Sequence, residues 1–123
     1  MDRIKKSAVH SKAHLLITLG EIKSNPTNYP IYSLFISLKS KKWPKPVVCL
    51  SGGIHGDEPA AVEAMLTLLE NPGLYEQCLT DVDLVLFPCI NPYGYEHHTR
   101  TNGQGLDLNR KVVDTTCGCG QGR

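Results

Sequence analysis

Two segments near the start of the chain carry the hydrophobic pattern of β-strands. Residues 14–23 (HLLITLGEIK) are rich in apolar residues, and in residues 32–39 apolar side chains occupy every second position. A period of two is typical of a strand with one buried face. The connector between the segments, SNPTNYP, has the Pro and Asn content of a loop. We therefore expect two neighbouring antiparallel strands joined by a loop, with the one-sided pattern of a sheet edge.

The pattern changes after Pro46, where apolar residues become continuous. VVCL has no polar position, as a strand buried on both faces should have none, and it leads directly into residues 51–53 (SGG). A helix is expected next, capped by Asp57 or Glu58, with Pro59 in its first turn, and it should stop at the sequence NPG. Its apolar residues recur at i, i+3, i+4 and i+7 and are predicted to face the core: Val62, Met65, Leu66 and Leu69.

A second continuous apolar strand is predicted over residues 83–90 (DLVLFPCI). It completes a strand–helix–strand unit, whose two strands should be parallel and whose crossover should be right-handed. The predicted fold class is therefore α/β, with parallel central strands in a mixed sheet and a flanking helix. Within a single domain we expect an N-terminal arm (1–13), the α/β core (14–110) and a disordered tail (111–123).

Composition narrows the class of partner. The 123 residues carry 13 Lys plus Arg against 12 Asp plus Glu, a net charge of +1, which leaves no broad basic field for binding nucleic acid. The four lysines of the linker KSKKWPKP are interpreted as belonging to a solvated loop. A small or neutral molecule is the expected partner.

The cysteines and the apolar runs bear on location. Five cysteines are an odd number, and Cys49 and Cys89 lie in apolar runs, where free thiols behave as small hydrophobic residues. The N-terminal sequence has no apolar segment of signal-peptide length, and no run approaches the ~20 residues needed to cross a bilayer. We expect a cytoplasmic protein in a reducing environment, without a membrane partner.

Unusual polar sequence follows each of the two predicted parallel strands: GGIHGDEP after the first and NPYGYEHHTRTNGQGLDLNR after the second. Ligands of open α/β sheets bind at the carboxyl ends of such strands, so the two segments should converge. His55 and Glu58 have an H-x-x-E spacing across the strand-to-helix turn and could both contact a Zn²⁺ ion. The alternative is a histidine and a helix-capping glutamate with no metal.

Arg100, Asn109 and Arg110 lie on the second, Gly-rich segment. A guanidinium binds a carboxylate through two hydrogen bonds and keeps its charge at any pH, and an Asn amide can donate another. Together they could clamp a carboxylate and leave one arginine for a reacting carbonyl. Taken one at a time, an arginine is more often a surface residue, and it is the combination of the three residues that favours a clamp.

The segments GGIHGDE and NPYGYEHHTRTNGQGLDLNR, in this order and at this spacing, resemble the zinc metallocarboxypeptidases of the carboxypeptidase A type, including their peptide amidase and N-acyl amino acid deacylase relatives. The resemblance covers roughly residues 47–110. It implies an incomplete, three-layer zinc-carboxypeptidase-like fold. It also implies zinc-dependent hydrolysis of C-terminal amide bonds, with a partner that is a peptide or an N-acyl amino acid bearing a free carboxylate.

The resemblance also implies a role for each candidate residue. His55 and Glu58 would be the first two Zn²⁺ ligands, and Arg100 would polarise the scissile carbonyl. Asn109 and Arg110 would hold the substrate carboxylate. Asp107 would accept a hydrogen bond from the first His ligand, which fixes its tautomer.

The third zinc ligand and the general-base Glu of the family have no match, because the 13 residues after Arg110 contain neither His nor Glu. His97 and His98 are interpreted as solvent-facing loop residues, and Cys117 and Cys119 as part of the disordered tail. We therefore expect a truncated catalytic-domain fragment with poor Zn²⁺ affinity and negligible hydrolysis. Where further strands would dock, an exposed sheet edge could support self-association.

Three functions stay open. The first is a zinc carboxypeptidase or peptide amidase. The second is an N-acyl amino acid amidohydrolase of the succinylglutamate desuccinylase and aspartoacylase type, which shares the H-x-x-E and D-x-N-R elements. The third is a non-catalytic remnant that keeps the fold.

Overall fold

The computed structural model describes residues 2–11, 15–24 and 27–111. In chain order the elements are α1 (Asp2–His10), β1 (Leu15–Ser24), β2 (Thr27–Ile36), β3 (Val47–Ser51), α2 (Ala60–Glu70), the 3₁₀ helices η1 (Pro72–Leu74) and η2 (Glu76–Thr80), β4 (Asp83–Phe87), α3 (Pro92–His97) and α4 (Leu108–Lys111). The strands form a sheet in the order β1-β2-β4-β3. The pairs β1–β2 and β2–β4 are antiparallel, and β3–β4 is parallel. The predicted α/β class with a mixed sheet is confirmed.

The first two strands pair as expected, but over a greater length. β2 begins at Thr27, which pairs with Ser24, so most of the segment expected to be a loop belongs to the hairpin. Residues 25 and 26 lie outside the described residues. The expectation of a loop over SNPTNYP was therefore wrong for its second half, because pairing with β1 overrides the Pro and Asn content. Leu34 and Ile36 of β2 are fully buried, as their alternation predicts.

The unit β3-α2-β4 places the candidate site, and its parallel strands were predicted. Val62, Leu66 and Leu69 of α2 are buried, and Met65 is partly buried against the same core. The predicted cap was wrong. The N-cap position is Pro59, and no side chain caps the helix by a hydrogen bond. The Glu58 carboxylate lies instead against His55 and Arg100.

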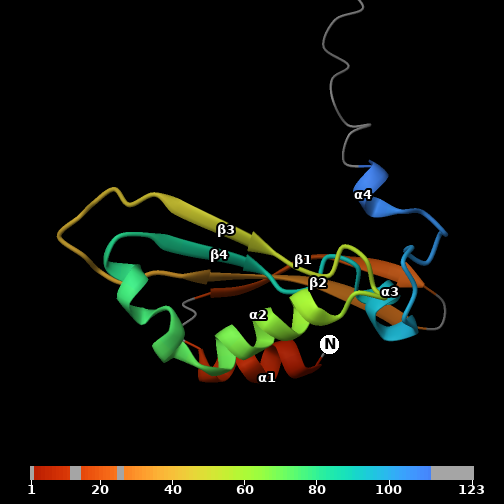
Figure 1. Cartoon of the computed structure of the whole chain (residues 1–123), viewed down its shortest axis with the longest axis horizontal. Coiled ribbons are helices and arrows are strands. Elements are labelled where there is room, and N and C mark those ends of the chain that lie inside the picture. Colours follow the sequence, from red (N-terminus) through yellow and green to blue (C-terminus); the bar gives the residue numbers. More distant parts are fainter. Residues whose placement is uncertain (1, 12–14, 25–26, 112–123) are drawn as a thin grey trace, which may run out of the picture.

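β3 is much more exposed than its sequence predicted. Val47 is 58% exposed and Val48 38% exposed, and Cys49 is also exposed. The reason is position, since β3 is an edge strand of the described sheet and pairs with β4 alone. Helices α1 and α2 lie side by side on one face of the sheet (Figure 1). Cys89 is buried as predicted, and burial raises the pKa of its thiol to about 12.

The N-terminal residues expected as an arm contain α1, which packs on α2. Ile4 joins the hydrophobic core, and Arg3 pairs with Glu63 at 2.7 Å. Of the predicted tail, only Lys111 is among the described residues. None of the described helices is long and apolar enough to cross a membrane.

The lysine-rich linker differs from its prediction at one position. Lys39, Lys41 and Lys42 are exposed, as a solvated loop requires. Lys45 is buried, with its side chain 1% exposed, and pairs with Asp83 at 2.8 Å. The prediction was wrong for Lys45 because its ammonium group is enclosed by Asp83 and by the carbonyls of Leu38 and Leu79.

Candidate functional site

The two polar segments predicted to converge do so at the carboxyl ends of β3 and β4. Backbone hydrogen bonds continue past the strands, with Gly52 N–H donating to Phe87 O and Ile90 N–H donating to Gly52 O, both at 3.0 Å. Gly53 has φ +66°, and a Cβ there would lie 2.6 Å from a methyl group of Val62. Only glycine fits this turn, which directs the next residues over the strand ends.

His55 lies between two carboxylates. Its Nδ1 is 3.4 Å from Glu58 Oε1, and its Nε2 is 3.2 Å from Asp107 Oδ1. The ring is 8% exposed, whereas the Glu58 side chain is 64% exposed. Both carboxylates accept hydrogen bonds, but Asp107 is the nearer and the more buried of the two, with 14% of its side chain exposed, so it favours a hydrogen on Nε2. The lone pair of Nδ1 then points toward the Glu58 carboxylate. A proton or a metal ion placed between the two could bind to both.

Arg100 completes this group from the second segment. Its Nη1 lies 3.3 Å from Glu58 Oε1, and its Nε donates to Asp107 Oδ2 at 3.1 Å. The guanidinium therefore spans both carboxylates that flank His55, and it is half exposed. A cation held at this edge can also contact an oxygen of a bound ligand.

Asp107 organises the loop that carries the candidate clamp. Burial would raise the pKa of its carboxyl, but hydrogen bonds from His55, from Arg100 and from the backbone N–H of Asn109 outweigh that effect and hold the pKa below its usual range. Asp107 is therefore ionised at neutral pH. It can hold the His55 ring and the start of α4 at the same time.

Asn109 and Arg110 lie on α4 at the rim of the group. Asn109 N–H donates to Asp107 Oδ1 at 3.0 Å. Arg110 is 84% exposed, and its Nε lies 3.7 Å from Asp107 Oδ2. Both side chains are exposed, so this end of the site is open to a carboxylate-bearing molecule.

The donor set fits part of a zinc site. An imidazole nitrogen and a carboxylate oxygen are ligands that Zn²⁺ accepts, and the partner on the opposite ring nitrogen is the usual second contact of a metal-bound His. Within the described residues, however, no group of three or more His, Cys, Asp and Glu side chains could hold a metal ion. His55 and Glu58 are therefore two donors at a place where a catalytic zinc site normally has three protein ligands.

The neighbouring histidines have other contacts. The His97 ring packs against Tyr93, with centroids 4.2 Å apart, and its Nε2 lies 3.4 Å from the Tyr29 hydroxyl. His98 has φ 53° and ends α3. This aromatic cluster joins the second segment to β2, a contact between distant residues that the sequence pattern did not predict. Cys117 and Cys119 lie outside the described residues.

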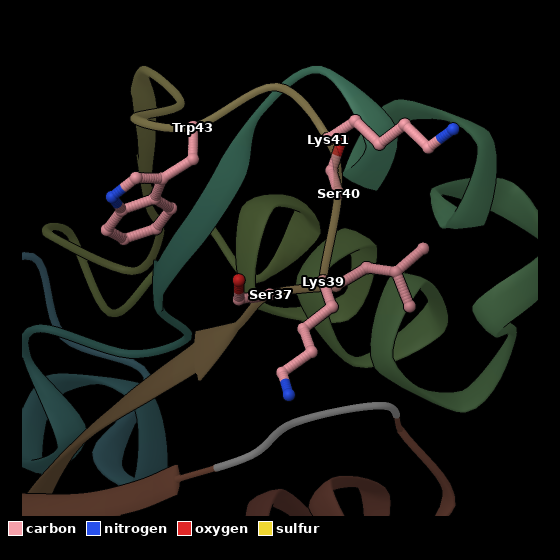
Figure 2. A pocket seen from close by; sticks show the side chains of 6 residues that line it. Ser37, Lys39, Ser40, Lys41 and Trp43 are labelled. Atoms are coloured by element: carbon pink, nitrogen blue, oxygen red, sulfur yellow. The ribbon is translucent and has the colours of Figure 1, made fainter.

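A pocket lies away from this site, at the end of the sheet where β3 begins. It is lined by residues 37–41 and by Trp43. Figure 2 shows the ammonium groups of Lys39 and Lys41 pointing in different directions, away from the Trp43 ring. The lining offers no converging set of polar groups, so we place no chemistry there.

Comparison with known proteins finds one matching family. The family model described as zinc carboxypeptidase matches residues 8–118. The chain is 28% identical over 112 residues to Carboxypeptidase SOL1 of Arabidopsis thaliana, covering 85% of this chain and 22% of that protein.

Two solved structures share the fold. The metallo-carboxypeptidase from Burkholderia cenocepacia has a TM-score of 0.71 at 22% identity, over 91% of this chain and 31% of that one. The succinylglutamate desuccinylase/aspartoacylase from Rhodobacter sphaeroides has a TM-score of 0.53 at 24% identity, over 68% of this chain and 24% of that one. The chain thus spans about a fifth to a third of the length of these proteins.

Proposed function

Because the chain belongs to the zinc carboxypeptidase family, whose members are hydrolytic metallocarboxypeptidases, we propose that its site serves zinc-dependent hydrolysis of the C-terminal amide bond of peptides. The observation that carries the proposal is the position of His55 between two carboxylates, with Nδ1 facing Glu58 and Nε2 held by Asp107. Arg100 beside them supplies the positive charge that an oxyanion requires.

Each side chain has a proposed part. His55 and Glu58 would hold Zn²⁺, which when bound supplies an activated water and polarises the carbonyl. Asp107 keeps the His55 ring oriented. Arg100 donates to the carbonyl oxygen as negative charge develops on it. Asn109 and Arg110, exposed on α4, bind the terminal carboxylate and so direct cleavage to the last residue.

The described residues supply neither a third ligand nor an unassigned general base at this site. Removal of a general base typically costs about 10² to 10⁴ in rate. The proposal therefore expects the 123-residue chain to bind Zn²⁺ weakly and to hydrolyse peptides close to the background rate. For the 123-residue chain, binding of Zn²⁺ and binding of a carboxylate are therefore easier to measure than hydrolysis.

Zinc titration by calorimetry tests the metal site. We expect one weak site in the original chain and its loss in His55→Ala and in Glu58→Gln. His98→Ala is the matched control, since His98 is an exposed histidine at the C-cap of α3. Equal Zn²⁺ binding by the original chain and by His55→Ala would contradict the proposal.

The runner-up function is hydrolysis of N-acyl amino acids. The H-x-x-E and D-x-N-R elements are common to both activities, and the Rhodobacter structure shares the fold. Prolonged incubation with excess Zn²⁺ and either a blocked dipeptide or an N-succinyl amino acid separates the two, because it detects slow release that is only slightly above the background rate. Arg100-dependent release from the dipeptide supports the carboxypeptidase, and release from the acyl amino acid alone supports the deacylase. Bound zinc with neither product supports a non-catalytic remnant.

A further inference from the structure

Asn91 connects the two segments that form the site, although its side chain contacts none of the candidate site residues. It follows β4, caps α3 and is 0% exposed. Its Oδ1 accepts from Gly94 N–H at 2.9 Å, and its Nδ2 donates to the Ile54 carbonyl at 3.3 Å. A single carboxamide therefore joins the residue before His55 to the helix that leads toward Arg100.

The backbone of Asn91 makes the same connection. Its N–H donates to Gly53 O at 2.9 Å, and its carbonyl accepts from Tyr95 N–H at 3.0 Å. The side chain and the main chain together fix the distance between the loop after β3 and the start of α3. In a buried position, each of these polar groups would cost free energy if it lost its partner.

Two glycines show how closely the segments approach. A Cβ on Gly56 would lie 1.8 Å from the carbonyl carbon of Gly94, and a Cβ on Gly94 would lie 2.4 Å from Asn91 Nδ2. Neither position has room for a side chain. The segment of His55 and the segment of Arg100 thus meet backbone to backbone, directly beside the Asn91 carboxamide.

We propose that Asn91 is a positioning residue, which holds the His55 loop and the Arg100 loop at the separation that lets both reach Glu58 and Asp107. It touches neither metal nor substrate and acts through the Ile54 carbonyl and the Gly94 amide. Its catalytic meaning depends on the proposed function, but its effect on the His55 environment does not.

Asn91→Asp is the sharpest variant. It keeps the size of the side chain and the acceptor for Gly94 N–H, but a carboxylate cannot donate to the Ile54 carbonyl and repels it. Asn71→Asp is the matched control, since Asn71 is exposed at the end of α2, where its Nδ2 donates to Thr67 O. Gly56→Ala is a second variant. Its methyl group pushes the His55 segment away from Gly94 and leaves the side chain of Asn91 unchanged.

Two readouts separate positioning from general stability. The first is the tautomer and hydrogen bond of His55, seen by ¹⁵N NMR of histidine in metal-free protein. The second is the Zn²⁺ dissociation constant. We expect Asn91→Asp to lose the fixed Nε2–H tautomer and to weaken Zn²⁺ binding about 10- to 100-fold, as changes to outer contacts of metal ligands do. Asn71→Asp should match the original chain in both.

A folded Asn91→Asp protein with the original His55 spectrum would overturn the proposal. If the original chain binds no Zn²⁺ but its His55 tautomer responds to Asn91→Asp, the metal part of the proposed function fails and the positioning role stands.

Hydrogen exchange of the unmodified chain tests the contact even if the variant does not fold. We expect the amides of Asn91 and Gly94 to be protected like those of β4. The amides of Gln104 and Leu106, which donate to the exposed Asn102 side chain, should exchange quickly. Equally fast exchange at Gly94 would also contradict the proposal.

Discussion

At the scale of single residues, Lys45 shows how a buried charge can be accommodated far from the candidate site. Its ammonium group lies 2.8 Å from Asp83 Oδ1 as an ion pair, and it donates hydrogen bonds to Leu38 O at 2.7 Å and to Leu79 O at 2.8 Å. The ion pair joins Lys45, two residues before β3, to Asp83, the first residue of β4. Burial of two charges costs free energy, and their attraction offsets that cost only when the geometry is good and further hydrogen bonds satisfy the remaining polar groups.

Replacing one member of this pair should be costly, and replacing both should cost much less. Lys45→Met leaves the Asp83 carboxylate buried without its cation, and we expect a loss of about 3–5 kcal/mol in the free energy of unfolding. Lys45→Met with Asp83→Leu should recover much of that loss. Urea denaturation measures both. Lys42→Met is the control, since Lys42 pairs with Asp81 on the surface, and a large loss there would contradict the distinction.

The candidate site could be predicted only in part from the amino-acid sequence. The pairing of His55 with Glu58 follows from a spacing of three across a tight turn, which is local geometry. The approach of Arg100 and Asp107 depends on two strand ends meeting, which the strand–helix–strand pattern supplies. The role of Asn91 and the burial of Lys45 depend on contacts with residues 37 and 38 positions away, and no local pattern encodes those.

At the scale of elements, one carboxylate connects three helices. Glu63 of α2 accepts from the Tyr95 hydroxyl of α3 at 2.7 Å and from Arg3 of α1 at 2.7 Å. The hydrogen bond from Tyr95, followed by that from Arg3, lowers the pKa of Glu63. In turn, the hydrogen bond to Glu63, followed by burial, raises the pKa of Tyr95 to about 12. The docking of α1 was not predicted, because it depends on this distant carboxylate.

These shifts predict a pH window for the contribution of Tyr95 to stability. Tyr95→Phe should lower the free energy of unfolding by about 1 kcal/mol near neutral pH, the usual value for a hydrogen bond. A lowered carboxyl pKa means that the difference is present above the ordinary value of 4.5 and is lost as pH falls through the pKa of Glu63 in the folded protein. Because the pKa of the Tyr95 hydroxyl is raised, the same difference in the free energy of unfolding is present below the ordinary value of 10.0 and is lost as pH rises through about 12.

Urea denaturation of the original chain and of Tyr95→Phe across pH measures this window. Tyr93→Phe is the control, since Tyr93 packs through its ring, which Phe retains. A difference between the original chain and Tyr95→Phe that stays constant from neutral to strongly acidic pH would show that packing, not the hydrogen bond, sets the effect.

At the scale of the whole molecule, the sheet has an apolar edge. The outer edge of β3 is unpaired in the described part of the chain (Figure 1). Val47, Val48 and Cys49 of this strand are exposed. An exposed, uncharged strand edge favours pairing with another strand. A continuous apolar run correctly indicated a strand but could not indicate which neighbours cover it, because that depends on residues beyond the run.

We predict that a second copy of the chain pairs with this edge when no other strand does. An antiparallel pair of β3 strands has a two-fold axis, and Cys49 is the central residue of Val47–Ser51. Opposite residues of such a pair have Cα atoms about 4.5–5.5 Å apart, which suits a disulfide.

Mild oxidation should therefore give a dimer linked through Cys49, which mass spectrometry of the peptides would identify. In reducing buffer, sedimentation should show association that depends on the protein concentration. Val48→Lys should weaken both, because a charge on the edge opposes pairing, whereas Cys49→Ser should remove the crosslink and keep the association. A chain that sediments as a monomer at every concentration, or that crosslinks through the exposed Cys78 instead, would show that β3 does not pair with itself.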